Sequence, residues 1–214
     1  MEYKSITLNP DMWRGDEVAI FAGGASLTQE QVDSCKHCKV IAINNSYQIA
    51  PWADILYACD TQWWEWHDGC PDFKGWKITH EQVKRWEKIQ QGIDVPRPPY
   101  PGIDIIVSNG AEGFSNKQDR IRHGGNGGYQ ALHIAMLLGA KTIYLYGYDM
   151  HARGDKSHWH GEHPTGRQRD GRYIEWIQKF DALADAAKER GQIIINKTPN
   201  SALQCFEREE LMLF

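Results

Sequence analysis

Short apolar runs recur along the chain, and most are followed by a stretch in which apolar residues have helical spacing. Six runs have the length and the β-branched or aromatic content of buried strands: residues 17–22, 39–43, 54–58, 104–107, 142–146 and 192–195. Strands that alternate with helices are typical of a parallel sheet. The pattern therefore predicts an α/β fold, with a doubly wound, mainly parallel sheet and helices on both faces, in one domain spanning residues 1–214.

Capping and glycine signals mark several helix boundaries. Thr28 and Gln31 have the spacing of a capping box, which predicts a helix that begins after Thr28. Gly139 and Gly191 are placed to end two longer helices, one that begins after Asn126 and one at residues 173–190. We also expect a short helix at 61–66, a strand at 74–79, a helix at 80–90 and a helix at the C-terminus.

Residues 61–102 form a candidate insertion that is rich in aromatic residues and proline. Five of the nine tryptophans and five of the nine prolines of the chain fall within it. Four of these prolines lie between residues 92 and 102, which predicts a loop there. The tryptophans either cover the sheet or form a partner surface, so a homo-oligomer remains open.

Small polar residues or glycines follow most of the predicted strands. They are Gly23, Gly24 and Ser26, then Asn44, Asp60, Ser108 and Asp149. Ligands of open α/β sheets bind at the carboxyl ends of the strands, so these residues predict a shared crevice there. For the Gly23–Leu27 segment taken alone, a tight turn without a ligand explains the sequence equally well.

The stretch from Gly124 to His163 combines several functional signals. Four glycines flank Asn126 at a predicted helix start, and the N–H groups of such a start can hold an anion. Asn126, Gly127 and Gly128 are therefore candidate phosphate-binding residues. The buried strand at 142–146 then leads to Asp149 and to four histidines, at positions 151, 158, 160 and 163.

Charge and hydropathy exclude some classes of protein. The net charge is −4 and there is no basic run, which argues against a dedicated nucleic-acid surface. No apolar stretch reaches the roughly 18 residues of a membrane span, and the N-terminus lacks the apolar core of a signal peptide. We therefore expect a cytoplasmic protein.

The five cysteines are an odd number at irregular positions, which favours a reducing compartment. Cys35 and Cys38 form a C-x-x-C pair. No second pair follows at the spacing of a zinc ribbon, and the pair ends a predicted helix. The sequence therefore does not lead us to expect a structural metal at Cys35 and Cys38.

Four segments, in order, resemble a known superfamily. They are IFAGGASL at 20–27, IAINNS at 41–46, the glycine-rich helix start through Gly-x-Asp at 126–149, and SHWH at 157–160 with PNSAL at 199–203. Together they are similar to the Rossmann-like superfamily of bacterial CMP-sialic acid-dependent sialyltransferases and motility accessory factor proteins. Within it, the chain most resembles small phage-encoded members.

This resemblance implies a nucleotide-sugar-dependent glycosyltransferase that needs no metal or other cofactor, in a bacterial or phage-infected cell. Gly24, Ser26 and Asn44 would hold the nucleotide sugar, and Gly127 and Gly128 would contact its phosphate or the transferred sugar. His158 matches the general base, and Asp149 is the second predicted catalytic residue. The acceptor is unknown. The Asp149–His158 loop is short, where the sialyltransferases carry a long lid.

Two other readings stay open. A relative of the accessory factors is a pterin diphosphokinase, so a metal-dependent pyrophosphokinase or phosphohydrolase is one alternative. His158, His160 and His163 would then bind the metal, with Asp149 as a candidate carboxylate ligand. The other alternative is a non-enzymatic phage accessory protein that keeps the fold.

Overall fold

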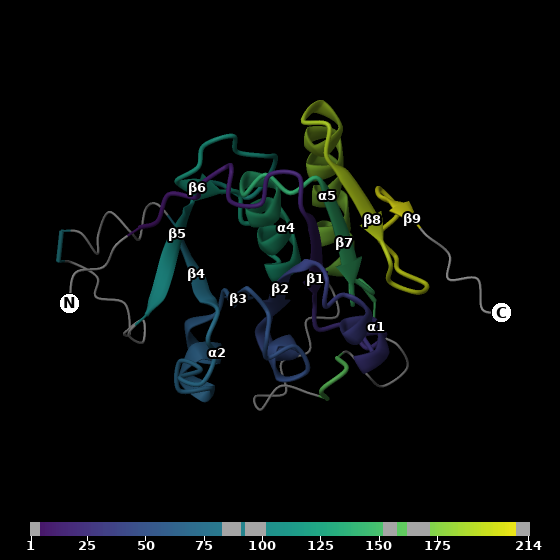
Figure 1. The fold of residues 1–214 in the computed structure, drawn as a ribbon. Coiled ribbons are helices and arrows are strands. Elements are labelled where there is room, and N and C mark those ends of the chain that lie inside the picture. The colour runs from purple at the N-terminus through teal and green to yellow at the C-terminus, as the bar shows by residue number, and fades with distance from the viewer. Residues whose placement is uncertain (1–4, 83–90, 93–101, 152–157, 162–171, 209–214) are drawn as a thin grey trace.

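The computed structural model describes residues 5–82, 91–92, 102–151, 158–161 and 172–208. Within these ranges all the strands join one parallel sheet, so the predicted α/β fold is confirmed (Figure 1). The strands, given in their order across the sheet, are β6 (Arg120–Ile121), β5 (Ile103–Ser108), β4 (Trp76–Gln82), β3 (Ile55–Tyr57), β2 (Lys39–Ile43), β1 (Glu17–Phe21), β7 (Thr142–Tyr146), β8 (Ile193–Asn196) and β9 (Glu207–Arg208).

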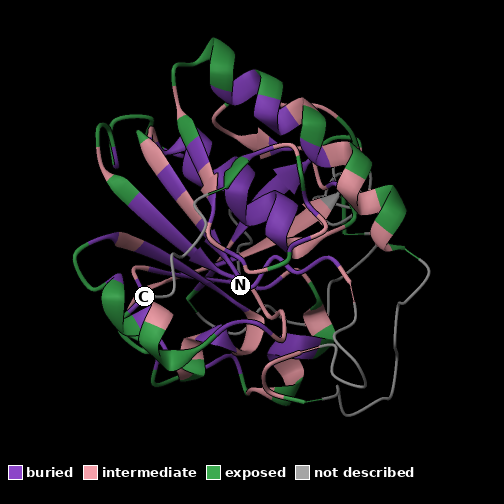
Figure 2. Ribbon diagram, turned by 90° about the vertical axis from the view of Figure 1, so that its right-hand side faces the viewer, coloured by how far each residue is buried: buried purple, intermediate pink, exposed green. Residues whose placement is uncertain are grey.

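The helices cover both faces of the sheet because both faces of the strands are apolar. In β1, Val18 and Ile20 pack in one hydrophobic cluster with α4 (Gly127–Leu137) and α5 (Tyr173–Glu189). Ala19 and Phe21 point the other way and pack with α1, η1 and α2, whose bounds are Gln29–Ser34, Asn44–Gln48 and Thr61–Trp66. Figure 2 shows the strands largely buried between these two layers.

The direction in which strands are added reverses between β1 and β7. From β1 the chain adds β2 to β6 on one side of the sheet, and then returns to place β7 and β8 on the other side. Connections leave β1 and β7 toward opposite faces, and ligands of open α/β sheets bind at the carboxyl ends of the strands at such a reversal. The glycine turn that follows β1 and the Gly147–Asp149 segment that follows β7 therefore meet at this switch point.

The central helix α4 is buried along almost its whole length, as a helix in the middle of a doubly wound sheet must be. Asn126 caps its first turn, since the side-chain oxygen accepts hydrogen bonds from the N–H groups of Gly128 and Tyr129. Gly139 follows its end with a φ of 91°, a left-handed conformation that suits glycine.

Two predicted helices are wrong within the described residues. His80–Gln82 belong to β4 and pair with residues 106–108 of β5, because pairing across the sheet outweighs the local helical spacing. Near the C-terminus, Glu207 and Arg208 form β9 beside β8 instead of a helix. The rest of the predicted 80–90 helix, at residues 83–90, lies outside the described residues. The same holds for residues 209–214 of the predicted C-terminal helix and for most of the predicted 92–102 loop.

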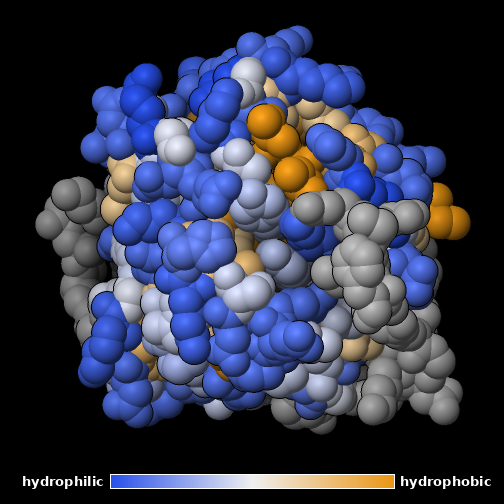
Figure 3. Space-filling model, turned by 45° about the vertical axis from the view of Figure 1, so that its right-hand side comes forward, coloured by the Kyte–Doolittle hydropathy of each residue, from blue (hydrophilic) through white to orange (hydrophobic). Residues whose placement is uncertain are grey.

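The outer surface is mostly hydrophilic. Figure 3 shows one face, on which hydrophobic residues lie in small groups among hydrophilic ones. The large hydrophobic residues that are exposed come from separate segments of the chain: Met12, Trp52, Trp66, Ile174 and Ile193. In the described ranges, no helix is both long enough and apolar enough to cross a bilayer. Assembly into a homo-oligomer stays a prediction.

Buried His133 should make the fold sensitive to acid. Burial lowers the pKa of this fully buried α4 side chain to about 4, while an unfolded histidine titrates near 6.5. Between these values the unfolded chain binds more protons, so stability is lost as the pH falls from 6.5 to 4, by about 3 kcal/mol at the lower end. Denaturant titrations at several pH values should show a smaller loss for His133→Gln than for the parent. His37→Gln, which alters an exposed histidine, should follow the parent when both proteins are measured metal-free, in the presence of a chelator.

Candidate functional site

The glycine turn after β1 packs directly on the carboxyl end of β7. The Gly24 N–H donates to the Gly147 carbonyl at 3.0 Å, and the Ser26 hydroxyl donates to Asp149 Oδ2 at 2.7 Å. A Cβ at Gly24 would lie 2.0 Å from Asp149 Oδ2 and 2.3 Å from the Gly147 oxygen. Glycine is therefore required at position 24 for the two strand ends to approach this closely.

Asp149 is a buried carboxylate at the centre of the switch point. Only 3% of the residue is exposed, and Oδ2 accepts the hydrogen bond from Ser26. Oδ1 is also buried, and it has no hydrogen-bond partner in the described part of the chain. A buried polar atom in this state needs a partner, because desolvation without a hydrogen bond costs free energy. A ligand hydroxyl or N–H group that reaches Oδ1 would supply one.

The loop behind Asp149 fixes the carboxyl end of β7. The Tyr148 N–H donates to the Thr198 hydroxyl at 2.9 Å, and the Ala202 N–H donates to the Asp149 carbonyl at 2.9 Å. The Ser201 hydroxyl donates to the Tyr148 carbonyl. The late PNSAL segment thus has a structural role, which is to hold Tyr148 and Asp149 in place.

His158 lies against the same glycine turn. Its backbone forms an antiparallel bridge with Gly24, and its Nδ1 lies 3.2 Å from the Gly23 carbonyl oxygen. A carbonyl can only accept, so Nδ1 is the nitrogen that carries the proton. In the neutral ring, Nε2 then carries the lone pair, which is the form required of a base or of a metal ligand.

Trp159 anchors this segment, a contribution to the site that the sequence analysis missed. Its N–H donates to the Gly23 carbonyl at 3.2 Å, and its indole Nε1 lies 3.4 Å from the Ser46 hydroxyl, which in turn donates to the Ala22 carbonyl. The Trp159 ring also meets the His160 ring edge-on, with centroids 5.4 Å apart.

His160 lies beside His158. The two rings are stacked with centroids 5.1 Å apart and an interplanar angle of 3°. His163, the third histidine of the predicted metal set, lies outside the described residues, so that set stays a prediction.

The start of α4 contributes one backbone group to the site. The N–H groups of Gly128 and Tyr129 donate to the Asn126 side-chain oxygen. A phosphate bound by the Gly128 N–H, as predicted, would have to displace this capping hydrogen bond. The Gly127 N–H makes no hydrogen bond within the described residues. A Cβ at Gly127 would point toward Ile43 and Cys59, at 3.5 and 3.8 Å. Gly127 therefore faces the carboxyl ends of β2 and β3, and Asn126 acts as a helix cap.

The other predicted site residues are spread along the carboxyl edge of the sheet. Asn44 follows β2 with a φ of 50° and is half-buried, and Asp60 is exposed after β3, just before α2. Ser108 is buried at the end of β5, four strands from β1, or about 19 Å at the usual strand spacing. The cluster around Gly24 thus includes Ser26, Asp149 and His158, and Ser108 is remote from it.

An open cleft of about 410 Å³ lies on the α5 side of the glycine cluster. It is lined by Glu112, Gly113, Glu175, Gln178, Lys179 and Ala182. Gly125 adjoins this side of the molecule, since a Cβ there would lie 3.3 Å from Trp176 Nε1. The lining of this cleft does not include the Gly24 turn or His158.

Comparisons with family models, with characterised proteins and with solved structures find no match to this chain. The site is therefore interpreted from its own geometry.

Proposed function

We propose that this chain is a nucleotide-sugar-dependent glycosyltransferase, with the donor bound at the switch point between β1 and β7. The observation that carries the proposal is the contact of three separate segments at one place: the Gly24 turn, Asp149 and His158. The ordered motifs that resemble the sialyltransferase and motility accessory factor superfamily support the same reading.

In this proposal the nucleotide lies along the Gly23–Leu27 turn and its phosphates approach the start of α4. The Gly127 N–H and the positive end of the helix dipole attract the phosphate charge, so no lysine is required. Asp149 Oδ1 accepts a hydrogen bond from a donor hydroxyl or base N–H. We expect a pyrimidine nucleotide, a cytidine nucleotide first, on the basis of the resemblance.

His158 acts as the general base. Its Nε2 takes the proton from the acceptor hydroxyl as that oxygen bonds to the anomeric carbon. The bond from the anomeric carbon to the donor phosphate breaks in the same step, and the nucleotide leaves as the anion. The Gly23 carbonyl keeps the proton on Nδ1 and thereby orients the ring for this transfer.

A thermal-shift screen of nucleotides and nucleotide sugars, with and without a divalent ion, tests the proposal most directly. A ligand at a hundredfold excess over its Kd should stabilise the folded state by about 2.7 kcal/mol. A cytidine or other pyrimidine nucleotide that shifts the melting temperature without an added ion is the expected result. A shift only with a divalent ion would instead favour the pyrophosphokinase alternative.

Replacing Gly127 with valine should block nucleotide binding without unfolding the protein. The first added carbon has ordinary contacts with Ile43 and Cys59, and the branched methyl groups would occupy the space in front of the N–H. We expect at least about a tenfold loss of nucleotide affinity by calorimetry, with Gly127→Ala intermediate and melting temperatures close to the parent's. Parental affinity in the valine variant would rule out the phosphate position.

A further inference from the structure

A mixed cluster of side chains lies at the amino ends of β1 and β2, at the edge of the sheet opposite to the proposed donor site. Glu17 is the first residue of β1, and His37 and Cys38 directly precede β2. Val18 of β1 pairs with Lys39 of β2 in parallel register. The residues that precede this pair, Glu17 and Cys38, therefore lie side by side. One oxygen, one imidazole nitrogen and one sulfur of these residues lie within 4.8 Å of one another.

We propose that Glu17, His37 and Cys38 bind a zinc ion, through a carboxylate oxygen, the imidazole Nε2 and the thiolate. Zinc takes these three kinds of ligand at about 2.0–2.3 Å, so tetrahedral geometry separates the ligand atoms by about 3.3–3.7 Å. His37 Nε2 already lies 3.7 Å from Glu17 Oε2. Small side-chain rotations would bring the three atoms to the remaining distances.

The surroundings orient the carboxylate for this role. The Tyr144 hydroxyl of β7 donates to Glu17 Oε1 at 2.8 Å, while the other oxygen, Oε2, faces His37. A hydrogen bond of this kind from outside the ligand set fixes a ligand in place and raises metal affinity. Glu17 and His37 are exposed, which gives an ion a path from solvent, while Cys38 is buried beneath them.

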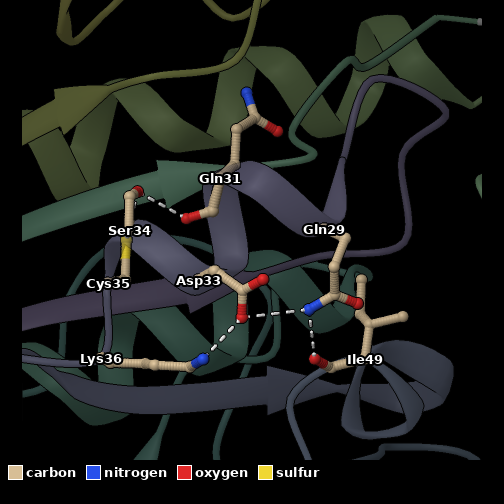
Figure 4. A network of polar contacts seen from close by, with 7 residues as sticks. All are labelled: Gln29, Gln31, Asp33, Ser34, Cys35, Lys36 and Ile49. Carbon is tan, nitrogen blue, oxygen red and sulfur yellow. Dashed lines mark hydrogen bonds and ion pairs between the residues drawn. The ribbon is translucent and has the colours of Figure 1, made fainter.

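The neighbouring lysines do not oppose a cation here, because both are drawn toward other carboxylates. Lys36 forms an ion pair with Asp33 at 2.9 Å, and Lys39 lies 3.4 Å from Asp54. Figure 4 shows the Lys36 side chain extended toward Asp33 of α1. The two positive charges of the zinc ion would be balanced by the Glu17 carboxylate and by the Cys38 thiolate that forms on binding.

The Cys35 thiol is the nearest candidate for the fourth ligand, and water is the alternative. Cysteine spacing alone gives no hint of this site, because Glu17 is distant from Cys38 in the chain and only the pairing of β1 with β2 brings the two together.

Zinc titration of the reduced, chelator-treated protein, in competition with a chromophoric chelator, tests the site. We expect one ion per chain and a thiolate-to-metal absorption band when cobalt replaces zinc. His37→Gln and Cys38→Ser should each weaken zinc binding at least about tenfold. Cys70→Ser removes a buried free thiol outside the cluster and should bind zinc like the parent.

His37→Gln keeps the test decisive even if Cys38→Ser destabilises the fold, because the His37 side chain is exposed. Zinc affinity that is unchanged in His37→Gln, or the absence of the thiolate band with cobalt, would overturn the proposal. A zinc site that depends on His158 instead would overturn it as well, and would support the metal-dependent reading of the donor site.

Discussion

Gly24→Ala should destabilise the protein by about 5 kcal/mol, far more than a single added methyl group usually does. The new carbon would lie 2.0 Å from Asp149 Oδ2 and 2.3 Å from the Gly147 carbonyl oxygen. Neither neighbour can swing away, because one is backbone and the other is a buried carboxylate. Overpacking costs up to about 3 kcal/mol, and breaking the hydrogen bond from Ser26 to Asp149 adds about 2 kcal/mol.

Denaturant unfolding of two matched variants isolates the cause. Gly127→Ala adds the same methyl group at another glycine of the site, where the contacts are 3.5 and 3.8 Å, and should change stability by less than about 1 kcal/mol. Ser26→Ala removes only the hydrogen bond to Asp149 and should cost about 2 kcal/mol. If Gly24→Ala unfolds at the same denaturant concentration as Gly127→Ala, the two strand ends are not packed as described.

The fold was predictable where local pattern and tertiary contacts agree. The runs at β1, β2 and β7 are apolar on both faces because helices cover both, and such runs stand out in the sequence. β6 and β9 are two residues long, and three of their four side chains are charged, so only their pairing identifies them. At His80 the local pattern is helical, but the partner strand β5 lies more than twenty residues away in the sequence.

The site could be predicted only in part, for a related reason. Glycine and polar residues at strand ends mark the carboxyl edge, but not which of them lie together. Strand order decides that: Gly24 meets Asp149 because β1 lies beside β7, whereas Ser108 lies four strands away. The capping role of Asn126 also depends on side-chain direction, which residue spacing does not give.

His158→Ala should reduce turnover by about 10²–10⁴-fold while nucleotide affinity hardly changes. The proposed base contacts the acceptor hydroxyl and not the donor, so its loss acts on the chemical step. In the parent, turnover should increase with pH and then level off, as catalysis by a general base requires. His67→Gln changes a histidine at the end of α2 and should keep parental turnover.

Chelators separate this mechanism from the metal-dependent alternative. With His158 as a base, chelator treatment should leave turnover unchanged at temperatures where the protein stays folded, even if zinc is lost from the Glu17 cluster. With His158 as a metal ligand beside His160, chelators would abolish activity and added metal would restore it. A His158→Ala variant that matches the parent in turnover and in pH profile would contradict both mechanisms. That result would favour the non-enzymatic alternative.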